Sequence, residues 1–380
     1  MRVVHVYKDI YPVKGGIEDY ILQVCTRLRD TYHIDARILV TSPTRRTEHT
    51  EIAGVPTVKA ARVAAPASTP LSPVLPRLLR DLEPDLVHLH MPYPMGELAY
   101  LLATSRTPMV ITYHSDVVRQ RALMRVYGPI MDLVMRRARI IFATSPQYKA
   151  SSVWLRRHRA RCRILPQGID QRPYTQPTPH TQELAADLRA RYGPNLLHSH
   201  GVFRYYKGLR YLVEALPLLP EARLLLTGAG PEEAALRTQV TALGLDARVH
   251  FAGFVSDDDL PAYHHASDVY ALPAIARSEA FGLSLVQAQA SGVPCLSTDV
   301  GTGTSYVNLD GVTGLVVPPM DPPAMAAAAR RLLDDDALRH ALGTQARRRA
   351  AELFDIDTNV AAIADAYGEV GSRESGVGSR

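Results

Sequence analysis

Glu279 stands three residues before Gly282 in a stretch whose residue types are suited to binding an anion. Residues 283–290 follow without glycine or proline and are predicted to form a helix, which Gly292 and Pro294 end. The first backbone N–H groups of such a helix are unpaired and its dipole is positive there. The stretch therefore predicts a phosphate-binding site, although an ordinary strand-loop-helix unit with a solvated Glu279 also explains it.

A glycine pair, Gly15 and Gly16, lies between a predicted strand at residues 2–7 and a predicted helix at residues 20–28. Paired glycines at this place let a ligand approach the backbone closely. The full dinucleotide fingerprint G-x-G-x-x-G is missing, so a tight turn without a ligand is an equal interpretation.

Histidines mark the ends of two further predicted strands. His88 and His90 lie two residues apart and share one face of their strand, as a metal-binding pair does. No carboxylate or third histidine stands near them in sequence at ligand spacing, so we predict no metal and place them at the strand end near a pocket. His114 follows the strand at residues 108–113, at the carboxyl end where ligands of parallel sheets bind, and a capped helix start there is compatible with that role.

The composition is that of an ordinary globular protein, with 46% hydrophobic and 21% charged residues. Cys25, Cys162 and Cys295 are too few and too widely spaced for a disulfide framework or a zinc site. No stretch is long and apolar enough to cross a bilayer, and the chain begins directly with a strand, so we expect a cytoplasmic protein.

Five arginines fall within the eight residues of Arg156–Arg163, in a chain whose formal net charge is +5. This patch suits nucleic acid, anionic lipid or a phosphorylated acceptor, and a solvated helix end is the alternative interpretation. No nucleic-acid-binding module accompanies it. We therefore expect no nucleic acid as a partner and consider peripheral attachment to the inner membrane face.

Strands alternate with helices through both halves of the chain, which predicts an α/β protein of two Rossmann-like parallel-sheet domains facing a cleft. The proline-rich residues after position 170 read as a linker. The predicted parts are an N-terminal Rossmann-like domain, a linker, a second Rossmann-like domain, a helix crossing back to the first domain and a disordered tail, at residues 1–170, 171–190, 191–355, 356–370 and 371–380.

Residues 279–286, Glu-Ala-Phe-Gly-Leu-Ser-Leu-Val, and residues 288–295, Ala-Gln-Ala-Ser-Gly-Val-Pro-Cys, resemble the donor-site motif of retaining glycosyltransferases of family 4. The resemblance extends over nearly the whole chain in the family's order. It includes the Pro-x-x-Gly-Gly loop at 12–16, the Pro-x-Gly-Ile-Asp element at 166–170 and a glycine-to-Lys-Gly pattern at 201–208. It implies the two-domain GT-B architecture, with an acceptor-side domain at residues 1–170 and a nucleotide-sugar-binding domain at residues 191–355. It also implies transfer of a sugar from a nucleotide diphospho-sugar to a hydroxyl of a glycan or lipid-linked acceptor, with retention of configuration.

The resemblance also implies which residues form the site, with no obligatory metal and no cofactor. Residues 301–308 and 203–208 most resemble mannosyl- and rhamnosyltransferases of surface polysaccharide synthesis, which favours GDP-mannose or a related donor. The residues expected to take part in catalysis are His114, Glu279 and Lys207. Those expected to bind the donor are Gly15, Gly16, Arg204, Lys207, Val255, Phe281, Gly282, Leu283 and Gln287.

Two positions depart from the family pattern. Val202 stands where an arginine is expected, and Gln287 where a second glutamate is expected. Arg204 is a candidate to supply the missing charge from a shifted position. The run of carboxylates at residues 257–259 is interpreted as helix capping and not as a metal site. Two alternatives stay open: a sugar-nucleotide epimerase, whose acidic catalytic pair is not found, and a non-catalytic nucleotide-sugar-binding homologue.

Overall fold

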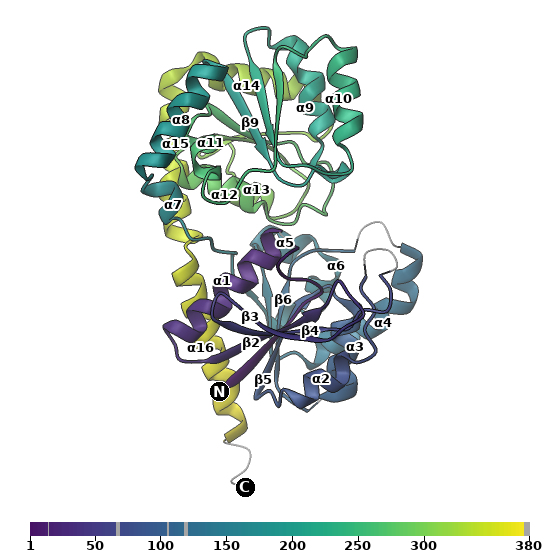
Figure 1. Ribbon diagram of the computed structural model, residues 1–380. Coiled ribbons are helices and arrows are strands. Elements are labelled where there is room, and N and C mark those ends of the chain that lie inside the picture. Colours follow the sequence, from purple (N-terminus) through teal and green to yellow (C-terminus); the bar gives the residue numbers. More distant parts are fainter. Residues whose placement is uncertain (14, 66–68, 105, 118–120, 376–380) are drawn as a thin grey trace. The chain divides into compact units, whose positions relative to one another are not determined.

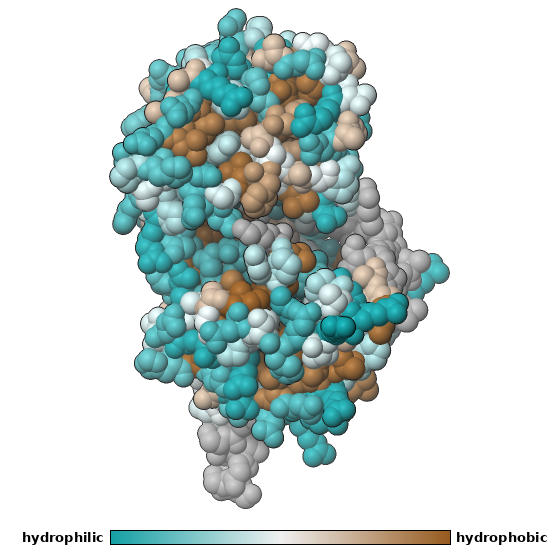
Figure 2. Space-filling model, in the orientation of Figure 1, coloured by the Kyte–Doolittle hydropathy of each residue, from teal (hydrophilic) through white to brown (hydrophobic). Residues whose placement is uncertain are grey.

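The computed structural model describes residues 1–13, 15–65, 69–104, 106–117 and 121–375, and the chain divides into two compact units. Unit 1 comprises Met1–Gly168 and Ile356–Arg380, and unit 2 comprises Ile169–Asp355. Each unit is a sheet with helices on its faces (Figure 1). In the view of Figure 2, hydrophilic side chains cover most of each unit and hydrophobic ones occur in separate patches.

Unit 1 contains an eight-stranded sheet in the order β3-β4-β2-β1-β5-β6-β7-β8. The strands are β1 (Arg2–Val6), β2 (Asp35–Thr41), β3 (Glu48–Ile52), β4 (Val55–Ala60), β5 (Leu86–Met91), β6 (Met109–Tyr113), β7 (Ile140–Ala143) and β8 (Cys162–Ile164). All neighbours are parallel except β3 and β4. The strand order reverses direction between β1 and β5, and such a switch point is where ligands of open α/β sheets bind.

Helices from both ends of the chain cover unit 1. They are α1 (Gly16–Asp30), α2 (Leu75–Asp81), α3 (Pro94–Ala103), α4 (Arg121–Arg137), α5 (Pro146–Ser151), α6 (Val153–Arg157), the short η2 (Arg159–Arg161) and α16 (Ile356–Ser375). The yellow α16 runs beside the purple α1 (Figure 1). Tyr20 on α1 donates a hydrogen bond of 2.8 Å to Asn359, and Arg27 forms an ion pair of 2.6 Å with Asp357. Helix α16 is therefore part of the first unit's core.

Unit 2 contains a six-stranded, fully parallel sheet in the order β11-β10-β9-β12-β13-β14. The strands are β9 (Leu196–His200), β10 (Arg223–Thr227), β11 (Val249–Gly253), β12 (Val269–Leu272), β13 (Cys295–Thr298) and β14 (Gly314–Val317). The order reverses direction between β9 and β12. This pair of strands is the switch point of the second sheet.

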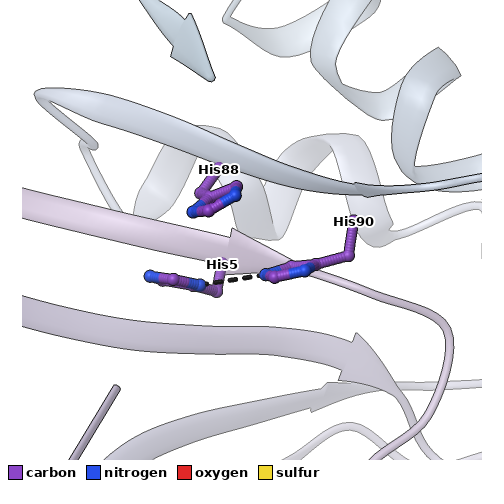
Figure 3. Close-up of side chains that lie close together, drawn as sticks. All are labelled: His5, His88 and His90. Carbon is purple, nitrogen blue, oxygen red and sulfur yellow. Dashed lines mark hydrogen bonds between the residues drawn. The ribbon is translucent and has the colours of Figure 1, made fainter. Parts of the chain in front are cut away.

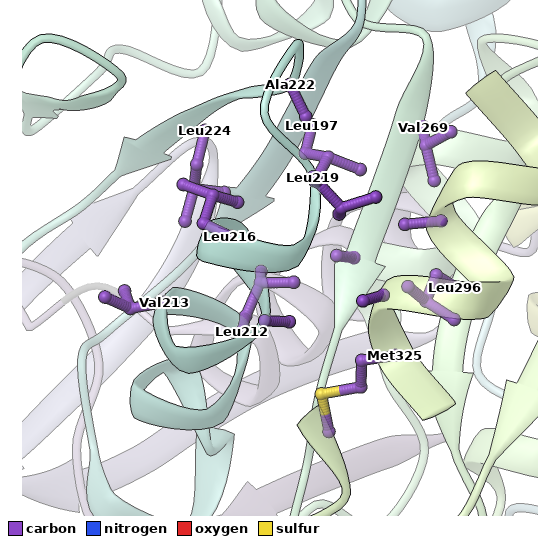
Figure 4. Packing of buried hydrophobic residues seen from close by; sticks show 14 of the residues in the cluster. Leu197, Leu212, Val213, Leu216, Leu219, Ala222, Leu224, Val269, Leu296 and Met325 are labelled. Carbon is purple, nitrogen blue, oxygen red and sulfur yellow. The ribbon is translucent and has the colours of Figure 1, made fainter. Parts of the chain in front are cut away.

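The helical segments of unit 2 are α7 (Arg172–Thr175), α8 (Pro179–Tyr192), η3 (Tyr205–Lys207), α9 (Leu209–Ala215), η4 (Leu216–Leu218), α10 (Glu233–Ala242), α11 (Leu260–His265), α12 (Leu283–Ala290), α13 (Thr304–Val307), α14 (Pro322–Asp334) and α15 (Asp336–Leu353). Leu212 and Leu216 belong to a buried cluster with Leu224 of β10 and Met325 of α14 (Figure 4). Burial on both faces accounts for the apolar strands.

Two predicted segments differ from the structure. Residues 171–190, predicted as a linker, form α7 and most of α8 within unit 2. Thr178 caps α8 by accepting a hydrogen bond from the backbone N–H of Thr181, and Pro179 occupies its first turn. Prolines at that position start helices, and the sequence interpretation took them as breakers. The predicted tail at 371–380 is helical to Ser375, and the rest of it lies outside the described residues.

No helix in the described part of the chain is both long enough and apolar enough to cross a membrane.

Candidate active site

An ion pair joins the loops that leave β9 and β12, at the switch point of unit 2. Nζ of Lys207 lies 2.8 Å from Oε2 of Glu279, and the two side chains are 15% and 11% exposed. Both residues come from the predicted catalytic set, although 72 positions separate them along the chain. Adjacent parallel strands end at the same sheet edge, which is why the fold brings them together.

The charges of this pair depend on each other. Burial alone would lower the pKa of Lys207, but the carboxylate of Glu279 and the phenols of Tyr270 and Tyr206 raise it above its ordinary value. The lysine therefore stays protonated in a site largely shielded from water. A shielded positive charge attracts an anion more strongly than one in bulk water does.

Backbone contacts fix the loop that carries Glu279. Its carbonyl accepts a hydrogen bond of 2.7 Å from the hydroxyl of Thr302, and the N–H of Ile275 donates to the carbonyl of Tyr206 at 2.8 Å. Gly208 has φ +67°, and a Cβ there would lie 2.0 Å from the carbonyl oxygen of Pro273. A glycine directly after Lys207 thus lets the two loops approach each other.

The predicted phosphate-binding site is the start of α12. Gly282 precedes the helix with φ +88°, in the left-handed region, and has no side chain with which to cap the first N–H groups. Leu283 and Gln287 lie on the one half-exposed side of α12, one turn apart, while the other residues of the helix are buried. Phe281 packs its ring against Phe354 in the core, so only its backbone can face a ligand.

Val202 and Arg204 are both exposed, and Phe203 between them is buried. The N–H of Arg204 donates a hydrogen bond of 2.8 Å to the carbonyl of Val202. A Cβ on Gly201 would lie 3.7 Å from Nζ of Lys207, so the lysine passes over this glycine. Arg204 and Lys207 therefore belong to the same short connection after β9.

His200, a residue outside the set expected from the sequence, ends β9 beside this loop. Its Nδ1 lies 3.3 Å from Oγ1 of Thr227, which in turn lies 2.9 Å from Nε2 of His198. Burial and then the charge of Lys207 lower the pKa of His200 to about 4, so its ring is neutral. A histidine at the last position of a buried strand was the signal that could have found it.

The protonation of His198, at the far end of the His200–Thr227–His198 contacts, determines which ring nitrogen of His200 carries the proton. Nδ1 of His198 is buried and has no hydrogen-bond partner among the described residues. A buried N–H without an acceptor is rarer and costlier than a bare nitrogen, so the proton of His198 belongs on Nε2, which donates to Thr227. The threonine hydroxyl then donates to Nδ1 of His200. Nε2 of His200 is left as an N–H donor.

Val255 follows β11 in unit 2 and is half-buried, next to Phe254, whose side chain is 71% exposed. β11 lies at the far edge of the sheet from β14. Val255 is therefore at a carboxyl strand end, like Lys207 and Glu279.

The remaining predicted site residues belong to unit 1. Gly15 is the N-cap of α1, with extended φ −170°, and Gly16 is its first residue. His114 is 4% exposed, and its N–H donates to the carbonyl of Met91 at the end of β5. Both ring nitrogens of His114 have protein partners, His90 at 2.9 Å and Gln167 at 3.0 Å.

The reason given from sequence for excluding a metal at His88 and His90 is wrong. A third histidine, His5 of β1, lies beside them, with candidate ligand atoms of all three within 4.8 Å of one another (Figure 3). Strand pairing brings it there, because His5 is in register with His88 across β1 and β5. His88 and His90 are also buried, at 0% and 1% exposure, inside unit 1.

Comparison with known proteins fits this geometry. Residues 14–173 match the model of the Glycosyltransferase Family 4 domain, and residues 181–349 match that of Glycosyl transferases group 1. D-rhamnosyltransferase WbpZ of Pseudomonas aeruginosa is 38% identical over 357 residues, covering 93% of this chain and 92% of that protein. This chain belongs to glycosyltransferase family 4.

A second relative of this glycosyltransferase is the O-antigen chain mannosyltransferase C of Escherichia coli. It is 32% identical over 375 residues, which cover 97% of this chain and 98% of the relative. The relatives therefore match through both units and not through one domain alone.

Solved structures share the fold. Sucrose-phosphate synthase from Thermosynechococcus elongatus superposes with a TM-score of 0.82 at 22% identity and covers 98% of this chain and 99% of its own. The lipopolysaccharide glycosyltransferase WaaG has a TM-score of 0.70 at 20% identity, covering 96% and 98%. The predicted class of two parallel-sheet domains in the GT-B architecture is confirmed.

We predict that Lys207→Ala lowers kcat/KM by an amount equivalent to about 2 to 4 kcal/mol, the scale of removing one key electrostatic donor. Removal of the lysine also leaves Glu279 as an unpaired, largely buried charge. Arg204→Ala should be nearly as damaging, since it removes the second cation of the same loop. Steady-state kinetics over a range of donor concentrations measures both.

Arg210→Ala is the matched control, because Arg210 is an exposed arginine of unit 2 that pairs with Glu214 on α9. It should leave kcat/KM unchanged. If Lys207→Ala behaved like this control while remaining folded, the lysine would not contact the reacting donor.

Proposed function

We propose that this glycosyltransferase moves a hexose from a nucleotide diphospho-sugar to a hydroxyl of a glycan or lipid-linked acceptor, with retention of anomeric configuration. The observation that carries the proposal is the shielded Lys207–Glu279 pair at the switch point of unit 2, beside the start of α12. A cation next to free helix N–H groups suits a diphosphate, and a carboxylate suits sugar hydroxyls.

In this proposal the bond between sugar and phosphate weakens as an oxocarbenium-like sugar forms. Lys207, Arg204 and the backbone N–H groups at Gly282 and Leu283 stabilise the charge that develops on the departing diphosphate. Glu279 accepts hydrogen bonds from the sugar hydroxyls.

Further residues of the proposed site bind the rest of the donor. His114 and the loop at Gly15 and Gly16 serve the transferred sugar and the acceptor side. Gln287 accepts a hydrogen bond from the ribose through its carbonyl oxygen, without the charge-assisted strength of a carboxylate. The Nε2 donor of His200 offers an additional neutral contact near Lys207.

The donor we propose is GDP-mannose or a related GDP-sugar. Two relatives that match almost the whole chain are named as a D-rhamnosyltransferase and an O-antigen chain mannosyltransferase. The motifs at 203–208 and 301–308 point to the same group of enzymes. The neighbouring structures of HepE from Anabaena contain UDP or UDP-glucose, so a UDP-sugar is the comparison donor for the assay.

One observation favours a second candidate, a nucleotide-sugar-binding homologue without turnover. Val202 and Gln287 each lack a charge that the family pattern places at the donor. In the transferase proposal Arg204 supplies the missing cation, whereas in the proposal of a homologue without turnover it does not. An epimerase, the other alternative, would release nucleotide without an acceptor.

A donor assay separates these candidates, and we predict that activity survives EDTA. The purified protein is incubated with GDP-mannose or UDP-glucose, with and without a lipid-linked glycan acceptor, and nucleotide release is measured. We expect GDP release that depends on the acceptor. EDTA should not reduce this release, because Lys207 and helix N–H groups supply the charge that a metal ion otherwise provides.

Strict dependence on added manganese or magnesium would contradict metal independence. Binding without release from any donor would favour the non-catalytic homologue. Product analysis by NMR completes the test, because an inverted anomeric centre would contradict retention.

We further propose that the arginines of Arg156–Arg163 attach unit 1 to an anionic membrane surface that carries the acceptor. All five arginines are exposed, on α6, η2 and β8. Arg157 pairs with Asp132 and Arg163 with Glu369, whereas Arg156, Arg159 and Arg161 have no ion pair in the described part of the chain. Val153, on the same short helix as Arg156, is 58% exposed and adds an apolar contact.

We predict that binding to vesicles rises with their anionic lipid content and falls with salt. Each arginine near such a surface contributes on the order of 1 kcal/mol, and salt screens the attraction. Changing Arg156, Arg159 and Arg161 to glutamate should abolish co-sedimentation with the vesicles. The control changes Arg45, Arg46 and Arg77 to glutamate, three exposed arginines of the same unit, for an equal change in net charge. Equal loss in both triple variants would reduce the effect to net charge.

A further inference from the structure

Four histidines and a tyrosine form a continuous hydrogen-bonded group inside unit 1, and the proposed mechanism uses only its outermost member. The group contains His5 of β1, His88 and His90 of β5, His114 after β6 and Tyr367 of α16, each at most 4% exposed. Burial lowers the pKa of His5 and of His114 to about 3, and it lowers those of His88 and His90 well below the ordinary value. All four rings are therefore neutral at physiological pH.

Three of the rings are linked end to end. Nε2 of His114 lies 2.9 Å from Nδ1 of His90, and Nε2 of His90 lies 3.0 Å from Nδ1 of His5, the contact that is dashed in Figure 3. Nε2 of His5 lies 3.2 Å from Oη of Tyr367. A neutral imidazole has one N–H and one bare nitrogen, so each ring donates on one side and accepts on the other. The protons of the whole row must therefore point in one common direction.

The outer end of the row gives that direction. Nε2 of Gln167, an amide nitrogen that can only donate, lies 3.0 Å from Nδ1 of His114. Nδ1 of His114 is then the bare nitrogen and its proton is on Nε2. The same assignment passes to His90 and to His5, which each carry their proton on Nε2.

The inner end agrees with this direction. Oη of Tyr367 contacts two imidazoles, Nδ1 of His88 and, at 3.2 Å, Nε2 of His5. A phenol has one proton, so it donates to one ring and accepts from the other. Because His5 carries its proton on Nε2, His5 donates to Tyr367 and the phenol donates to His88. His88 passes its own proton to Thr112 at 2.7 Å.

We infer that His90, His5 and Tyr367 are positioning residues that hold His114 in the Nε2–H form, so that Nδ1 of His114 is an obligatory hydrogen-bond acceptor. The inference rests on the proposed function for its consequence. A sugar hydroxyl that replaces the amide of Gln167 at this nitrogen must donate its proton to it. A group that can only accept, such as an ether oxygen, is rejected there.

A metal ion held by His5, His88 and His90 is the competing explanation. Their ligand atoms are close enough, and the rings are neutral as metal ligands must be. However, both nitrogens of each ring already have hydrogen-bond partners. The rings of His88 and His90 also stack, with centroids 4.5 Å apart and planes at 16°. Nitrogen lone pairs lie in the ring plane, so stacked rings do not aim them at one point.

The test uses Tyr367→Phe, which removes only the phenolic oxygen at the inner end. The N–H of His5 then faces no acceptor, and a buried N–H without a partner is costly. The cost falls if each ring of the row moves its proton to its other nitrogen. His114 is then protonated on Nδ1, and the amide of Gln167 turns its oxygen toward this N–H to accept the hydrogen bond. In the full-length protein labelled with ¹⁵N-histidine, NMR should show His114 protonated on Nε2 before the substitution and on Nδ1 after it. We expect kcat/KM for the donor to fall about tenfold, the scale of one hydrogen bond lost.

Tyr100→Phe is the control, since Tyr100 is another buried tyrosine of unit 1, and its hydroxyl donates to the carbonyl of Thr107 at 2.8 Å outside the row. It should leave the histidine spectrum unchanged. Unaltered tautomers in folded Tyr367→Phe would overturn the inference, as would one equivalent of metal in the purified protein bound to these rings. Reversed tautomers with unchanged donor kinetics would uphold the row and refute the contact between His114 and the sugar, while nucleotide release by the unchanged protein tests the proposed function separately.

Discussion

The ion pair of Lys207 and Glu279 is the interaction on which the proposed site of unit 2 depends. Neither charge is stable alone in a place so shielded from water, and each holds the loop of the other at the edge between β9 and β12. The same shielding strengthens their attraction for a ligand's charges. Gly208 and Gly282 serve this arrangement, one by letting the loops meet and the other by leaving the start of α12 uncovered.

Unit 1 places neutral side chains, and not a charged pair, at its switch point. Its switch point, between β1 and β5, carries buried imidazoles that are kept neutral by burial and satisfied by one another. In such a row the position of every proton depends on the two ends, here Gln167 and Tyr367. The two sheets thus place different chemistry at equivalent points: a cation and a carboxylate in one, and an oriented neutral acceptor, His114, in the other.

Much of this was predictable from sequence. Alternating strands and helices give the two parallel sheets, and the glycine before residues 283–290 gives the start of α12. Residues paired across strands were not predictable, because neighbours in a sheet have no fixed separation along the chain. His5 is the clearest case: nothing near it in sequence connects it with His88. The helices at 171–190 were missed because proline both breaks helices and begins them.

Isothermal titration with GDP tests the central claim, that the loop after β9 and the start of α12 hold the nucleotide. Val202→Arg adds a cation at an exposed position beside Arg204, and Gln287→Glu adds a carboxylate on the half-exposed side of α12. Each substitution should tighten GDP binding by roughly 1 to 2 kcal/mol, the scale of a charge-assisted hydrogen bond. Unchanged affinity in both variants, together with unchanged affinity in Arg204→Ala, would show that the nucleotide binds elsewhere.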